Sequence, residues 1–156
     1  MGETRHRTYD VLGIVMKFHA FPEEVQGKYC LVEAMVPEGR GAPPNHHAGE
    51  TEAFHVLDGE IAFHVDGRDF VARAGDHVAI PDGAVHAFTA VSARARVLIL
   101  NAPGLMHDAF FTGVGRPLPE GATEPLAPEG PPDVEALVAA AERAGMTLLL
   151  PEGAPG

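Results

Sequence analysis

Short apolar runs separated by turn-forming residues fill positions 10–102, and this pattern constrains the fold more than any other feature of the sequence. The runs are rich in Val, Ile, Phe and Leu and often alternate with polar residues, as half-buried strands do. Turn signals such as LDGE, VDGRD and PDGA lie between them, and their Asp-Gly pairs favour tight hairpins because Gly accepts a positive φ. Since no helical period lies between the runs, the pattern predicts an all-β fold, a single antiparallel jelly-roll β-barrel.

The character of the chain changes after residue 112. Residues 113–132 contain six prolines and four glycines, which indicates a strap without regular structure. The segment DVEALVAAAERAG then predicts one C-terminal α-helix, with Asp133 as its N-cap and Gly145 as its stop. We therefore expect a barrel over 1–112, with the strap and helix of 113–156 packed on the same domain. A lid over a pocket is the alternative role for the helix.

Composition excludes several classes of protein. The formal charge of −11, from 22 acidic and 11 basic residues, repels phosphate backbones, so no nucleic-acid partner is expected. The apolar runs are shorter than the ~20 residues of a membrane span, and no signal region is evident, so we expect a cytoplasmic protein without membrane contact. Cys30 and Ser92 are the only residues of their kinds, which excludes an internal disulfide and disfavours catalysis by a serine or cysteine nucleophile.

Histidine, in contrast, is abundant, with nine residues. On a strand, Asn45 and His47 point to one face and His46 to the other. Glu52 follows His47 by five residues, an odd number that would put the two side chains on opposite faces of a continuous strand. A turn at Gly49 interrupts the strand and allows both side chains to face the same side. His86 opens a later strand after the turn PDG. Two imidazoles and one carboxylate that converge inside a barrel form a metal site with open coordination positions.

The spacing of these residues resembles the two motifs of the cupin superfamily. The first motif matches at Gly39, His47, Glu52 and Gly59, with Asn45 in place of its first histidine. The second motif matches at Gly75, Pro81, Gly83 and His86, with Ala90 in place of its asparagine. Beyond the motifs, residues 10–150 resemble single-domain bacterial cupins similar to quercetin dioxygenases.

This resemblance implies one bound divalent transition metal ion, Fe, Mn, Ni, Co or Zn. It also implies that Glu52 both binds the metal and takes a proton from the substrate, and that the protein is a homodimer. The implied activity is a dioxygenase for a small aromatic or enolic, flavonol-like compound. Two alternatives stay open: a non-redox isomerase or decarboxylase of a sugar or keto acid, and a degenerate cupin that only binds a small molecule.

Asn45 leaves three interpretations of the metal site open. In the first, the ligands are His47, Glu52 and His86, and Asn45 either binds the metal weakly or only contacts the ligands. In the second, a bulge after Pro43 and Pro44 lets His46 turn inward as the third histidine. In the third, the site binds metal poorly or not at all. Glu50 competes with Glu52 as the carboxylate, and the six-residue step to Gly59 favours Glu52. His6, His19 and His107 lack partners at a ligand spacing, while His55 and His64 are expected to face solvent and His77 to be structural.

Overall fold

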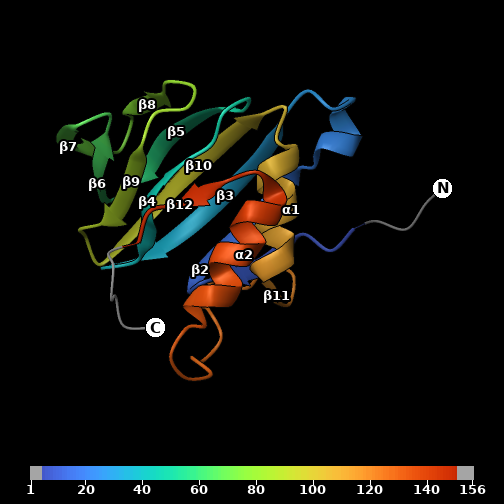
Figure 1. Cartoon of the computed structure of the whole chain (residues 1–156). Helices are drawn as coiled ribbons and strands as arrows, with labels where there is room; N and C mark the ends of the chain where they lie inside the picture. The colour runs from blue at the N-terminus through green and yellow to red at the C-terminus, as the bar shows by residue number, and fades with distance from the viewer. Residues whose placement is uncertain (1–4, 151–156) are drawn as a thin grey trace.

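The computed structural model describes residues 5–150, which form two antiparallel sheets and two α-helices (Figure 1). The larger sheet has seven strands in the order β11-β1-β2-β3-β10-β5-β8. Their bounds are Arg116–Pro117 (β11), Thr8–Val11 (β1), Ile14–Ala20 (β2), Cys30–Pro37 (β3), Arg94–Ala102 (β10), Thr51–Asp58 (β5) and His77–Ile80 (β8). A short 3-10 helix, Pro22–Val25, lies between β2 and β3.

The smaller sheet has five strands in the order β12-β4-β9-β6-β7. Their bounds are Thr147–Leu148 (β12), Gly41–His46 (β4), His86–Ala90 (β9), Glu60–Val65 (β6) and Arg68–Arg73 (β7). The two sheets share one core. Every second residue of β3 is buried, from Cys30 to Val36, and packs in one cluster with Ile61 and Phe63 of the smaller sheet. This arrangement confirms the predicted antiparallel β fold of jelly-roll type.

The Asp-Gly pairs have two different roles. Asp66 and Gly67 join β6 to β7, which are hydrogen-bonded neighbours, so the hairpin prediction is correct there. Asp58 and Gly59 instead lead from β5 in one sheet to β6 in the other, so no hairpin forms. At this corner a Cβ on Gly59 would lie 2.4 Å from the backbone oxygen of Arg94, and φ is +78°. The glycine is therefore needed for a close approach of two chain segments.

Two α-helices lie side by side where the sequence predicts one (Figure 1); the first packs against β1 and β3 of the larger sheet, and the second packs against the first and against β12. The predicted helix is α2, Val134–Ala144; the Asp133 side chain caps it by accepting from Ala136 N, and Gly145 ends it with φ +100°. The additional helix is α1, Leu105–Val114, and residue 112 lies inside it. Its N-cap, Gly104, has no side chain with which to cap the helix, so the usual start signal is missing. Packing of Phe110 and Phe111 into the core stabilises α1 instead.

The segment after α1 extends both sheets. β11 pairs with β1, and β12 pairs with β4. Beyond β11, the proline-rich strap is attached to β1 by Asp10. The buried Asp10 carboxylate accepts hydrogen bonds from the Arg116 side chain and from the backbone N–H of Leu126. Within residues 5–150, neither helix is long and apolar enough to cross a lipid bilayer.

Candidate metal centre

A bulge in β4 sets the position of the first site residues. The register between β4 and β9 shifts by one residue between Ala42 and Asn45, where two consecutive prolines cannot donate ladder hydrogen bonds. Asn45 therefore lies directly opposite His86. Asn45 and His47 are buried and His46 is partly exposed, which is the alternation that strand parity predicts.

Glu52 lies at the centre of the cluster. On β5 it is the register partner of Asn101 on β10. Its Oε1 lies 2.8 Å from Nε2 of His86 and 3.6 Å from Nε2 of His47. Its Oε2 accepts a 2.7 Å hydrogen bond from Nδ2 of Asn101. The structure thus brings together the three residues that the motif spacing selects, and Asn101 is a contact that the sequence does not reveal.

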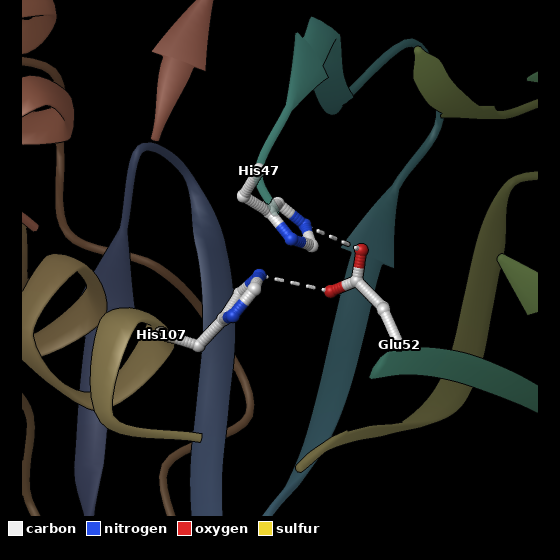
Figure 2. A group of neighbouring side chains, drawn as sticks. All are labelled: His47, Glu52 and His107. Atoms are coloured by element: carbon white, nitrogen blue, oxygen red, sulfur yellow. Dashed lines mark ion pairs between the residues drawn. The ribbon is translucent and has the colours of Figure 1, made fainter. Parts of the chain in front are cut away.

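His107 on α1 is the site residue that sequence reasoning misses. The expectation that it lacks partners is wrong, because its Nε2 lies 3.1 Å from Oε2 of Glu52 and its Nδ1 lies 2.7 Å from Oε1 of Glu50. Figure 2 shows the rings of His47 and His107 next to each other on one side of the Glu52 carboxylate, each turned toward a different oxygen. His107 lies 57 residues beyond Glu50, on a helix that carries no start signal, so no spacing rule connects the two.

Glu50 is fully buried and faces α1. Besides its contact with the His107 ring, its Oε2 accepts a 3.0 Å hydrogen bond from the backbone N–H of Met106. The interpretation that ranks Glu52 above Glu50 as a donor agrees with this arrangement, because both oxygens of Glu50 are taken up by the start of the helix.

The pKa values of the cluster are strongly coupled. Burial alone would raise the pKa of Glu52, but His107, His47 and His86 hold it well below its usual range. Burial would likewise lower the pKa of His107, yet Glu52 and Glu50 raise it to about 9. The His86 pKa also lies above its ordinary value, because Glu52 outweighs the effect of burial. The centre is therefore an ionised carboxylate surrounded by imidazoles.

His47 is the residue that indicates a missing partner. Both of its ring nitrogens are buried without a hydrogen-bond partner, and among residues 5–150 the Asn101 Oδ1 is the one other buried side-chain atom in this condition. Buried polar atoms normally have partners. Donor atoms of His47, Glu52 and His107 all lie within 4.8 Å of one another, so one cation between them would give one of the two His47 nitrogens a partner. Two imidazoles and a carboxylate suit a divalent first-row metal, and His86 adjoins as a further donor.

Asn45 supports this group through the backbone. Its Nδ2 donates to the carbonyl oxygens of Pro43 and His86, at 3.0 and 3.2 Å. The amide therefore holds the bulge and the start of β9 in place. His46 lies next to it but outside the cluster of donor atoms, so the bulge in β4 does not turn His46 inward.

The remaining histidines lie away from the centre. His55 and His64 are partly exposed, as expected, and His64 pairs with Asp69 at 2.7 Å. His77 is exposed on the edge strand β8, where its Nδ1 lies 3.3 Å from Nδ1 of His55. Their contacts therefore contribute nothing to the cluster around Glu52.

Glu52, His86 and His107 lie in the wall of an apolar cavity of about 80 Å³. Both sheets, α1 and the C-terminal segment contribute to its lining, with apolar side chains that include Ile14, Phe54, Phe88, Phe110, Leu137 and Met146. The polar lining residues are Asn45, Glu52, His86 and His107, and none of the described lining residues is a Lys or an Arg. The cavity thus offers apolar contact around a single polar centre.

Comparison with known proteins agrees with this architecture. Residues 32–101 match the family described as "Cupin domain". A quercetin 2,3-dioxygenase of Bacillus subtilis is 27% identical over 110 residues, which are 70% of this chain and 32% of that protein. The chain thus spans about a third of the length of that relative.

Two solved structures are similar in fold. KdgF from a Halomonas species superimposes with a TM-score of 0.56 at 23% identity, over 63% of this chain and 86% of that one. A predicted oxalate decarboxylase from Thermotoga maritima superimposes with a TM-score of 0.57 at 21% identity, over 63% of this chain and 93% of that one. At these identities the likeness concerns the fold alone. It agrees with the sequence match, so residues 32–101 resemble a cupin domain in both sequence and fold, and the findings together support a cupin superfamily protein.

Proposed function

We propose that this protein is a metal-dependent dioxygenase for a small aromatic or enolic compound. The observation that carries the proposal is the His47 ring, whose two buried nitrogens have no partner and which faces Glu52 beside an apolar cavity. A buried imidazole in this position is costly unless it binds something. The similarity to a quercetin 2,3-dioxygenase supports the oxidative chemistry.

The residues that would hold the metal are His47, Glu52 and His107, with His86 as a fourth donor. His107 directs Nδ1 to the Glu50 carboxylate and His86 directs Nδ1 to the carbonyl of Ala84, at 2.7 and 2.8 Å. When these Nδ1 atoms carry the protons, both Nε2 lone pairs face Glu52 and are free to coordinate. A bound divalent metal supplies a Lewis-acid centre at which a substrate oxygen and dioxygen can meet.

Glu52 is the proposed proton acceptor. Its carboxylate is ionised, so it can take the proton of an enolic O–H and return it to the product. In the metal-free site, the surrounding imidazoles keep the pKa of Glu52 low. When the rings bind a metal they are neutral and no longer donate an N–H to Glu52, so this stabilisation of the carboxylate is lost. Both atoms of one dioxygen molecule enter the substrate, which supplies all four electrons, so no further reductant is needed.

The cavity favours this substrate class over sugars and keto acids. Apart from the metal itself, the described lining offers no Lys or Arg that could bind the phosphate or carboxylate group of such a substrate, and most of its surface is apolar. The apolar lining, which includes Phe54, Phe88 and Phe110, suits an aromatic ring.

Metal content and oxygen consumption test the proposal. Protein produced with Fe, Mn, Ni, Co or Zn should contain about one equivalent of one of these metals. It should consume oxygen with a panel of catechols, small enols and flavonols, and incorporate both atoms of ¹⁸O₂ into the product. Metal-free protein after all five growths would contradict the metal site. Bound metal with isomerase or decarboxylase turnover and no oxygen uptake would contradict the dioxygenase activity.

A further inference from the structure

We infer that Glu50 is a positioning residue for the metal centre: it fixes the ring of His107 so that Nε2, and not Nδ1, faces Glu52 and His47. The inference rests on the proposed metal site and concerns a residue outside both cupin motifs. It explains why a buried carboxylate stands directly before β5, two residues ahead of Glu52.

The contacts of Glu50 determine the orientation of the ring. Oε1 lies 2.7 Å from Nδ1 of His107 and also faces the backbone N–H of the same residue at 3.4 Å. Oε2 accepts from the backbone N–H of Met106 at 3.0 Å. Glu50 thus contacts the ring Nδ1 of His107 and the backbone N–H groups of Met106 and His107. The other ring nitrogen, Nε2, lies 3.1 Å from Oε2 of Glu52.

A carboxylate is required here because both of its oxygens accept hydrogen bonds. Gln has nearly the same shape, but its amide offers one acceptor and would direct an N–H₂ group at either the ring N–H or the Met106 N–H. A carboxylate behind a metal-binding histidine also raises the basicity of the ring, and loss of such a partner costs about 10–100-fold in metal affinity.

A purely structural role for Glu50 is the competing explanation. The carboxylate lies at the start of α1, whose N-cap Gly104 provides no side-chain cap, and negative charge there stabilises a helix. Both roles predict that loss of Glu50 lowers the stability of the fold. They differ in whether the effect on metal binding passes through His107.

Cobalt titration of three variants separates the two roles. Glu50→Gln should bind Co²⁺ about 10–100-fold more weakly than wild type. The matched control is Asp108→Asn, which removes another carboxylate contact of α1, the ion pair between Asp108 and Arg5, without touching the His107 ring. It should leave the Co²⁺ affinity unchanged within about twofold, a margin of roughly 0.4 kcal/mol. In a His107→Ala background, Glu50→Gln should have no further effect on affinity, because the ring that it positions is gone.

Several outcomes would overturn the inference. One is an undiminished loss of affinity from Glu50→Gln in the His107→Ala background, and another is an equal loss from Asp108→Asn. If His107→Ala binds no cobalt at all, ¹⁵N chemical shifts of the His107 ring decide: the Nδ1–H tautomer should predominate in loaded wild type and be lost in Glu50→Gln. An unchanged tautomer would refute the positioning role. A wild-type protein that binds no metal would instead refute the proposed function.

Discussion

The strands and helix α1 deliver donors to the same carboxylate by different means. His47 directly follows β4 and His86 opens β9, and strand alternation with a one-residue bulge fixes the direction of each side chain. His107 comes from a helix that has no capping side chain of its own and that a buried glutamate holds at its start. The strand donors are thus oriented by backbone hydrogen bonds, and the helix donor by side-chain contacts.

This difference predicts different sensitivities in the two regions. Backbone ladders are insensitive to the identity of neighbouring side chains, so the strand donors should keep their positions in most single variants. The orientation of the helix donor depends on Glu50, whereas the ion pair of Arg5 with Asp108 and the packing of Phe110 and Phe111 hold helix α1 itself. The following predictions test the contrast, from the largest expected effect to the smallest.

Removal of both strand donors should abolish metal binding. In the double variant His47→Ala, His86→Ala, Glu52 and His107 remain, and two ligands are too few for a stable site of this type. We expect metal content to fall from about one equivalent to none, measured by elemental analysis of purified protein. Loss of His47 breaks no hydrogen bond, whereas loss of His86 removes its contacts with Glu52 and with the Ala84 carbonyl, so the metal-free variant should fold with lower stability than wild type. Retention of a full equivalent would show that the strand donors are not the basis of the site.

Removal of the helix donor should weaken metal binding and also affect the fold. His107→Ala leaves Glu50 buried without its charged partner, which should cost about 3 kcal/mol of stability in the metal-free protein. His107→Gln keeps a donor near Glu50 and should cost much less. Both variants should bind Co²⁺ about 10–100-fold more weakly. Urea unfolding and cobalt titration measure the two effects, and wild-type affinity in both variants would exclude His107 as a donor.

Much of the fold and the strand half of the site could be predicted from the sequence. The alternation of β3, the cap and stop of α2, and the convergence of His47, Glu52 and His86 follow from local spacing and turn chemistry. Helix α1 and His107 could not, since tertiary packing stabilises the helix and their contacts span some 57 residues. The Asp-Gly corner at Gly59 was also beyond local rules, because a turn sequence does not reveal which sheet the next strand joins.

Asn45→His should partly replace the helix donor by a strand donor. The amide of Asn45 faces the carbonyls of Pro43 and His86, and its loss should lower metal-free stability by about 1–2 kcal/mol. An imidazole at this position would add a donor on the buried face of β4. We expect about tenfold tighter cobalt binding, roughly 1.4 kcal/mol. The double variant Asn45→His, His107→Ala should then bind better than His107→Ala alone; no improvement would mean that the β4 bulge keeps residue 45 out of reach.

The smallest effect is expected from loosening α2, which packs against α1 and contributes Leu137 to the cavity lining. Asp133→Ala removes the hydrogen bond to Ala136 N that caps α2, and should cost about 1 kcal/mol of stability. Because Glu50 holds His107 from the sheet side, cobalt affinity should not change. Thermal unfolding and cobalt titration of one preparation measure both quantities, and Ser at position 133 should restore the stability because it also caps. A loss of affinity that parallels the loss of stability would mean that α2, and not Glu50, keeps the helix donor in place.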